Sequence, residues 1–347
     1  MDNVLNTLAS IRTNNPNLAN EKIDSAVLLR ALTLSMDDKL LYKLGKKQKV
    51  QRNKGTNTIT WRRYKPLPVA DNRHIIVEGV NPNGMKVGSM SVSGTVSVYG
   101  AYIQVTRQTE AYNLDKLLVE YGPLVVDHAR ETFELITRDA IEEDGGHYYV
   151  VPSGTATPSE AAITSSNILT LDVCRKVANN MKVNRRRGHQ ESNRYTVITS
   201  TEGMQDLLDD QKLETKAMVP GNTNKPILDN SLESYDIYNL RFYEYEYPVI
   251  NAGVGAAGAD VYHTYVIGEN AYAVLDLESA GIEMKRMGFE PKMGDNLGQI
   301  ASLGWISMGF GAQVLDPVAC TIVSHAVSTP LTRNDSDIYA SQTEISG

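Results

Sequence analysis

The stretch that most constrains the fold is residues 113–142, where apolar residues recur every three or four positions. In its second half the recurring residues are Val125, Ala129, Phe133, Ile136 and Ala140. This spacing places apolar side chains along one face of a helix and leaves the charged ones on the other faces. We predict a helix that ends at a break over Tyr121–Pro123 and resumes for about 20 residues, roughly 30 Å. A rod of this length acts as a spine for the rest of the chain.

The overall composition is that of an ordinary folded protein. The chain has 347 residues, of which 41% are hydrophobic and 22% charged, so we expect two or three structural modules. A net charge of −7 argues against bulk affinity for nucleic acid or anionic lipid. The two cysteines, Cys174 and Cys320, form no CxxC pair, which favours a reducing compartment. With no signal peptide pattern and no long apolar run, we expect a soluble protein made inside the cell.

Tyrosine is unusually frequent, with 18 Tyr against 4 Phe. Tyr combines an apolar ring with a polar hydroxyl, which suits surfaces that are buried against partner proteins. A polar core whose hydroxyls are hydrogen-bonded within the subunit explains the excess equally well.

Residues 56–88 read as an extended hairpin. Ile59 and Trp61 alternate with Thr58 and Thr60, which indicates a strand. A second short strand is expected at 75–80, before a type I turn at 81–84. Such a hairpin cannot cover its own faces and is marginal in water by itself, so another surface has to cover it.

Residues 91–106 give the longest strand signal. The apolar parity changes after Tyr99, from Val92, Val96 and Val98 to Ala101, Ile103 and Val105. A change of parity indicates a bulge or a change of sheet, and we place it at Gly100. We predict one strand that leaves the hairpin and enters the domain of the spine helix.

The remaining segments give shorter elements between a loose arm at 1–24 and a polar tail at 330–347. We expect helices within 25–44, at 166–183 with Asn167 as N-cap, at 201–210 and at 269–272. We expect strands at 195–200, 240–250, 261–267 and 281–287, and two strands within 301–325 on either side of Gly309–Gly311. The basic run 46–54 is interpreted as a solvated connector rather than an anion site. The arginines at 185–187 are interpreted as complementing a helix dipole rather than binding an anion.

No group of residues has the spacing of a catalytic or metal site. Gly253–Gly258 matches GxGxxG, but a strand rather than a helix is expected after it, so we interpret it as a hairpin loop. The six histidines are scattered, and Ser153 and Ser324 lack the context of a nucleophile. We therefore predict no catalytic, cofactor or metal residues and no enzyme. A nucleotide-dependent enzyme would rest on the Gly-rich loop alone.

Several stretches, taken in order, resemble the major capsid proteins of tailed bacteriophages, in particular the coat proteins of short-tailed, large-genome phages. The stretches are 59–67 with 77–82 (W/F-R-R-x-x-P-L, then E-G-V-x-P), 99–106 (YG-x-Y-x-x-x-T), 129–138, 268–273 (G-x-x-A-Y), and 295–299 with 303–305 (DPL-x-Q, then G-W). Each motif is moderately specific, but their order over residues 25–325 is consistent with this family. Two departures are the missing Pro after Asp295 and the Gly-rich stretch 251–260, which resembles a local insertion.

The resemblance implies an α+β fold of a recognisable plan. The plan has an N-terminal arm (1–45), an extended loop or E-loop (46–90), a peripheral domain with the spine helix (91–160), an axial domain (161–285), closing strands of the peripheral domain (286–330) and a C-terminal tail (331–347). The four candidate interface residues lie on the extended loop: Trp61, Arg62, Arg63 and Tyr64. Trp and Arg are the residue types that most often anchor interfaces.

The resemblance also implies a function as a structural subunit. Copies would form hexamers and pentamers of an icosahedral capsid around double-stranded DNA, which they would touch through weak, non-specific contacts. Expected partners are portal, scaffolding and decoration proteins, without cofactors and without a membrane. We expect assembly in the host cytoplasm and a final location in the virion. The alternative is the shell of a cellular nanocompartment of the same fold, which holds cargo enzymes.

Overall fold

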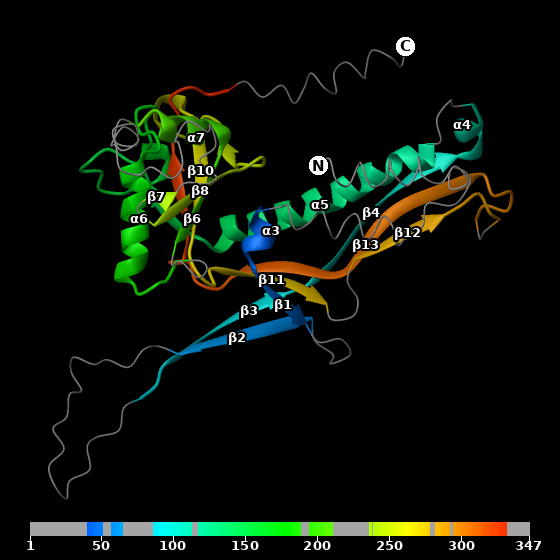
Figure 1. Ribbon diagram of the computed structural model, residues 1–347, viewed down its shortest axis with the longest axis horizontal. Helices are drawn as coiled ribbons and strands as arrows, with labels where there is room; N and C mark the ends of the chain where they lie inside the picture. The colour runs from blue at the N-terminus through cyan, green and yellow to red at the C-terminus, as the bar shows by residue number, and fades with distance from the viewer. Residues whose placement is uncertain are drawn as a thin grey trace, which may run out of the picture. The chain divides into compact units, whose positions relative to one another are not determined.

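The computed structural model describes residues 40–50, 57–64, 86–112, 117–188, 194–210, 236–237, 239–277, 282–291 and 294–331. The chain divides into two compact units (Figure 1). The first contains residues 1–144 and 272–315, and the second contains residues 145–271 and 316–347. Each unit has its own sheet and its own helices.

In the first unit one long helix lies along a mixed sheet. The helix is α5 (Leu117–Asp144), and the sheet has the order β1-β11-β13-β12, with β4 also paired to β13. The strands are β1 (Lys46–Val50), β4 (Ser97–Thr106), β11 (Tyr272–Leu277), β12 (Ile282–Met287) and β13 (Ile300–Val314). A short helix, α4 (Arg107–Tyr112), follows β4.

Aromatic side chains join the helix to the sheet. Phe133 of α5 is fully buried, with its ring centroid 5.2 Å from that of Trp305 and 4.4 Å from that of Phe310 on β13. The carboxylate of Glu134 accepts the backbone N–H groups of Leu41 and Tyr42, 3.0 Å each, in α3 (Leu40–Leu44). These two N–H groups belong to the first turn of α3, which has no helical acceptor for them. Glu134 is therefore a buried carboxyl group whose two oxygens are both hydrogen-bonded.

The prediction of a spine helix is confirmed, but the expected break is wrong. α5 runs through Gly122 and Pro123 without interruption. A proline removes one backbone hydrogen bond, and the packing of a 28-residue helix compensates for that loss. The buried face is also rotated slightly from the expected stripe, because Arg130, Glu134, Thr137 and Ile141 are buried while Ile136 and Ala140 are half-buried.

The prediction of two strands within 301–325 is confirmed, but the expected break at Gly309–Gly311 is wrong. β13 continues through both glycines, and the chain turns only after Val314. A Cβ at Gly309 would lie 2.8 Å from Cβ of Leu277, and one at Gly311 would meet the carbonyl of Thr95. These glycines mark places where neighbouring backbones approach closely, not a turn.

Two further expectations in the first unit need correction. The run that begins at Lys46 is not a connector but strand β1, which pairs parallel with β11. Val50 at its end is buried, while Lys46 and Lys49 are exposed. The change of parity lies at Val96, before Gly100, where one strand ends and β4 begins. In the same region β13 has a bulge: Ser307 pairs with Tyr99 and Phe310 with Ser97, so β13 has one residue more than β4 between these pairs. This bulge reverses which side chains face α5.

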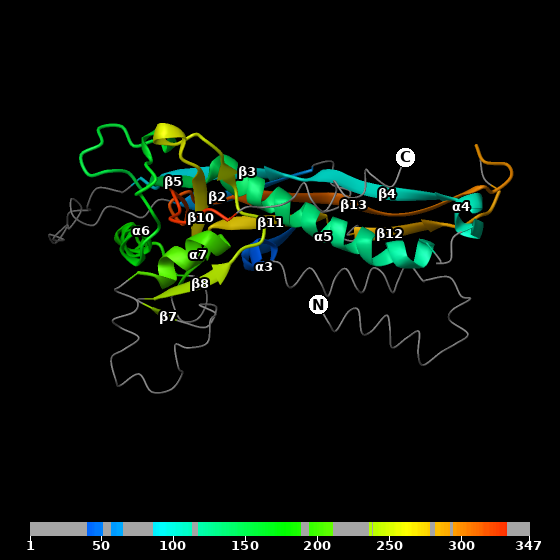
Figure 2. The ribbon, with the colours of Figure 1, turned by 90° about the horizontal axis from the view of Figure 1, so that it is seen from above.

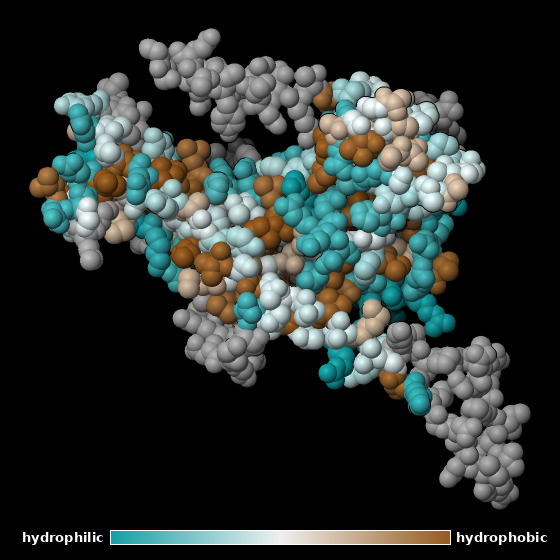
Figure 3. All heavy atoms as spheres, turned by 180° about the vertical axis from the view of Figure 1, so that it is seen from behind, coloured by the Kyte–Doolittle hydropathy of each residue, from teal (hydrophilic) through white to brown (hydrophobic). Residues whose placement is uncertain are grey.

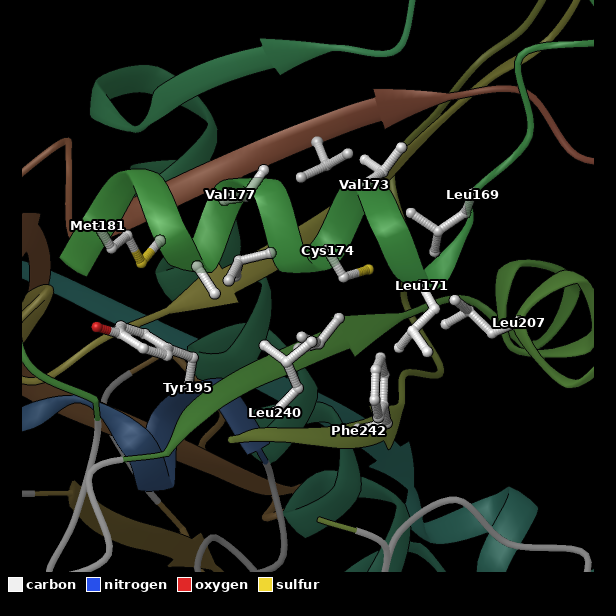
Figure 4. Close-up of a cluster of buried hydrophobic side chains, with 14 of the residues drawn as sticks. Leu169, Leu171, Val173, Cys174, Val177, Met181, Tyr195, Leu207, Leu240 and Phe242 are labelled. Atoms are coloured by element: carbon white, nitrogen blue, oxygen red, sulfur yellow. The ribbon is translucent and has the colours of Figure 1, made fainter. Parts of the chain in front are cut away.

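The second unit is a sheet of order β5-β14-β10-β6-β8-β7, with β9 paired to β10. Its strands are β5 (Gly146–Tyr149), β6 (Tyr195–Thr199), β7 (Asp236–Ile237), β8 (Leu240–Glu244), β9 (Ile250–Asn251), β10 (Val261–Ile267) and β14 (Cys320–His325). Helices α6 (Leu171–Val183) and α7 (Thr201–Leu208) and the 3-10 turns η2 (Glu160–Ala162) and η4 (Ala256–Gly258) complete it. Side chains of α6, including Cys174, Val177 and Met181, pack on Tyr195, Leu240 and Phe242 of the sheet (Figure 4).

Three expectations in this region are corrected. Asn167 does not cap α6. Its side-chain amide oxygen accepts the N–H of Thr164, and α6 begins at Leu171, whose N–H donates to the carboxylate of Asp210. The expected helix at 269–272 is a turn with Asn270 at φ 52°, followed by strand β11. Strand β14 lies in the segment 286–330, where we expect closing strands of the peripheral domain, but it pairs with β10 and β5 of the second unit. Strand β11 lies in the segment 161–285, where we expect the axial domain, but it pairs with β13 of the first unit.

Among the described residues, no helix has the length and apolar character needed to cross a lipid bilayer. Within the same part of the chain, no group of three or more His, Cys, Asp or Glu side chains is arranged to hold a metal ion.

Candidate inter-subunit interface

The four candidate residues lie consecutively on one strand of a two-stranded ribbon in the first unit. The ribbon consists of β2 (Thr58–Tyr64) and β3 (Ser89–Thr95), paired antiparallel from Thr58 opposite Thr95 to Tyr64 opposite Ser89. The partner of β2 is thus the start of the long strand signal. The expected strand at 75–80 lies outside the described residues. After Val96 the chain continues directly into β4. The predicted path from the hairpin into the helix domain is confirmed, but two strands, β3 and β4, form it instead of one.

Trp61 attaches the base of the ribbon to its own subunit. Its indole packs in a small cluster with Val50, Val96 and Leu275, and its Nε1 donates to the side-chain oxygen of Gln48 on β1. A Cβ at Gly94 would lie 3.0 Å from the indole ring, so the glycine leaves room for it. Trp61 is therefore largely occupied within the subunit. The sequence does not indicate its partner Gln48, because the basic, polar run at 46–54 is typical of a solvated connector.

The other three candidates are exposed. Arg62 and Arg63 lie on opposite faces of the ribbon, and Tyr64 is 63% exposed. Arg63 pairs across the strands with Met90, which is 54% exposed, on the face that carries Trp61. Arg62 and Tyr64 lie opposite Ser91 and Ser89 on the other face. The ribbon therefore offers two cations, an aromatic ring and a methionine on the part beyond Trp61.

The second unit contains a buried polar network, which connects four strands of its sheet and η2. The carboxylate of Glu160 lies 2.9 Å from Nε2 of His263 and accepts the side-chain amide of Asn251 at 3.0 Å. His325 Nε2 lies 2.9 Å from the hydroxyl of Thr264, which lies 2.7 Å from the hydroxyl of Thr199. Burial lowers the pKa of His325 to about 4. His263, His325 and Ser324 are buried, whereas Glu160 and Asn251 are half-buried, so the network joins η2 and β9 to the interior of the sheet.

The Gly-rich loop leads into strand β10, as the sequence predicts. The loop is closed by its own groups: the N–H of Gly253 donates to the carboxylate of Asp260 at 2.8 Å, and that of Gly255 to the carbonyl of Ala259 at 2.9 Å. No helix of the dinucleotide-binding kind follows it.

Comparison with known proteins gives a consistent answer at the level of the fold. No family model matches the sequence. No curated protein matches it either. Solved structures do match: the capsid of Ralstonia phage GP4 has a TM-score of 0.62 at 11% identity, over 84% of this chain and 89% of that one. The capsid of cyanophage P-SCSP1u has a TM-score of 0.59 at 13% identity, over 82% and 87%.

A third similar structure is an encapsulin rather than a phage capsid. The SrpI encapsulin complex of Synechococcus elongatus has a TM-score of 0.50 at 11% identity, over 84% of this chain and 89% of that one. The chain therefore has an α+β fold of the shell-protein type. More particularly, it has the fold of tailed-phage major capsid proteins, and the sequence prediction of this fold is confirmed.

Proposed function

We propose that this chain is the major capsid subunit of a tailed bacteriophage, which assembles into an icosahedral shell around double-stranded DNA. The observation that carries the proposal is the match of the whole architecture, since 84% of the chain superimposes on the Ralstonia phage capsid. The role is structural rather than catalytic. In this reading the first unit corresponds to the peripheral domain, the second to the axial domain, and the β2–β3 ribbon to the base of the extended loop.

The encapsulin structure supports the alternative of a nanocompartment shell less well. Its TM-score is 0.50, against 0.62 and 0.59 for the two phage capsids, at almost the same coverage. The motifs of residues 59–67 and 99–106 also resemble phage coat proteins. We therefore favour a virion component, built in the host cytoplasm from hexamers and pentamers with portal, scaffolding and decoration proteins as partners.

The exposed residues of the ribbon fit a contact between copies. An isolated two-stranded ribbon is marginal in water, and Arg62, Arg63 and Tyr64 are residue types that anchor interfaces when buried. Arg can form a two-pronged pair with a carboxylate of a neighbouring subunit. Trp61 holds the base of the ribbon in place for this contact, which makes it a positioning residue in the interface.

Electron microscopy of the purified protein, alone and with the scaffolding protein of the same phage, tests the proposal. We expect closed shells of uniform diameter. Protein that stays monomeric at high concentration and with scaffold would contradict any shell function. Shells that form in cells and enclose an enzyme instead of DNA would favour the nanocompartment.

A further inference from the structure

In the part of the chain that the structure describes, strand β4 is an edge strand of the first unit's sheet. In the described residues its only strand partner is β13, and Figure 2 shows it along one border of the sheet. Its ten residues, Ser97–Thr106, include no Asp, Glu, Lys, Arg or Pro. Proteins normally guard an exposed edge with charges, proline or short strands, because its free N–H and C=O groups can pair with another chain.

The other edges of the same sheet are guarded in this way. β1 carries three lysines, and β12 carries Glu283, Lys285 and Arg286. In a chain with 22% charged residues, a strand of ten residues would be expected to contain about two charges, whereas β4 contains none. An edge of this kind is compatible with a monomer only if something covers it.

The strand register shows which groups are available on this edge. Arg107 donates its N–H to the carbonyl of Gln299, which makes Arg107 and Gln299 a hydrogen-bonded pair. In an antiparallel ladder such pairs alternate with pairs whose backbone groups point outward. Counting back along the register, Ile103 and Val105 bond to β13, whereas Tyr102 and Gln104 direct their N–H and C=O groups to the free edge.

The side chains along this strand suit an uncharged partner. Val98 is 60% exposed and Tyr102 is 69% exposed, on the face of the sheet away from α5. Hydrophobic side chains also reach the surface of the first unit on the rear face of the molecule (Figure 3). An aromatic residue beside an incoming strand gives favourable cross-strand pairs. DNA is a poor partner here, because non-specific affinity for DNA comes from neutralising phosphates with Lys and Arg, which β4 lacks.

We infer that the free edge of β4 pairs with an extended segment of a second copy of this chain, so that the sheet continues across the subunit boundary. The inference rests on the proposed function, in which every subunit meets identical neighbours at high local concentration. It adds a main-chain contact to the side-chain contacts proposed for the ribbon. Peptides that add a strand to an open sheet edge bind in this way.

The variant Gln104→Pro tests the pairing. It removes an N–H that points away from β13, and proline is tolerated at such edge positions because no internal hydrogen bond is lost. The matched control Gln104→Ala removes the same exposed side chain and keeps the N–H. We expect Gln104→Pro to melt within a few degrees of Gln104→Ala and to raise the concentration needed for shell assembly by about ten-fold or more.

Hydrogen exchange gives a second, independent measurement. The amides of Tyr102 and Gln104 should exchange quickly in the free wild-type subunit and slowly in assembled shells, whereas those of Ile103 and Val105 are protected in both. Normal assembly by folded Gln104→Pro would overturn the inference while leaving the capsid function intact. So would protection of these amides by a different protein in subunits that remain unassembled. Failure of the wild type to assemble would instead contradict the proposed function.

Discussion

At the scale of single residues, Phe133 is the point where the helix and the sheet of the first unit meet. It is fully buried against Trp305 and Phe310. We expect Phe133→Ala to lower the free energy of unfolding by about 3–5 kcal/mol, because it leaves a cavity between α5 and β13. Chemical denaturation of the unassembled subunit measures this.

A matched control lies on the same helix. Leu124 is 58% exposed on α5, so Leu124→Ala should change the unfolding free energy by no more than about 0.5 kcal/mol. Equal losses for the two variants would show that the buried face of α5 has been assigned incorrectly.

His325 makes the second unit sensitive to acid. Its Nδ1 lies 2.8 Å from the carbonyl oxygen of Ala326, which can only accept, so Nδ1 donates and Nε2 accepts from Thr264. Burial lowers the pKa from 6.5 to about 4. Between these two pH values the unfolded chain binds a proton that the folded one excludes. Stability therefore falls as pH drops from about 6.5 to 4, by up to about 1.4 kcal/mol per pH unit.

The variant His325→Gln isolates this contribution. It cannot bind the proton, so its unfolding free energy should depend less steeply on pH between 6.5 and 4 than that of the wild type. The comparison concerns slopes, so a uniform loss of stability in the variant does not affect it. Identical slopes would show that His325 titrates at its ordinary pKa.

At the scale of elements, the β2–β3 ribbon separates two roles that adjacent residues play. Trp61 packs on Val50, Val96 and Leu275 of its own unit. We expect Trp61→Ala to lower the unfolding free energy of the subunit by about 1–3 kcal/mol. A Trp61→Ala subunit with unchanged stability and impaired assembly would show that the indole acts mainly between subunits.

The exposed arginines should behave in the opposite way. The double variant Arg62→Ala with Arg63→Ala should weaken assembly and change the unfolding free energy by about 0.5 kcal/mol or less, because both side chains are at the surface. Circular dichroism and size-exclusion chromatography of this variant beside Trp61→Ala distinguish the two roles. A double variant that assembles normally would remove the arginines from the interface.

The sequence predicts elements better than it predicts their neighbours. The spine helix and β12 are found because each has an apolar period, and β6 and β10 because a short apolar run marks a strand that is buried on both faces. The pairing of β14 with β10 rather than with the sheet of the first unit is not encoded in any local pattern. Glycines mislead for a related reason: Gly309 and Gly311 resemble a turn in sequence, but they are small because Leu277 and Thr95 lie against them.

The interface shows the same limit. Trp61, Arg62, Arg63 and Tyr64 stand out by residue type, but only the structure shows that the first of them is packed within the subunit while the others are exposed. The free edge of β4 was equally hidden, since a strand of alternating polarity carries no sign of how many partners it has. The lack of charge over Ser97–Thr106 is the one signal that could have indicated it.

At the scale of the whole molecule, the charge balance bears on how a shell would hold its contents. The chain has 41 acidic and 34 basic residues, which gives a net charge of −7. Non-specific DNA binding depends on neutralising phosphates and weakens steeply with salt.

We expect the unassembled subunit to bind duplex DNA no more tightly than about 10⁻⁴ M at physiological salt, measured by fluorescence anisotropy. The same titration at low salt is the control, because any weak binding there should disappear as salt is raised. Micromolar binding at physiological salt would mean that basic groups gather on one surface and that the shell grips its DNA, contrary to a container that encloses DNA through weak contacts.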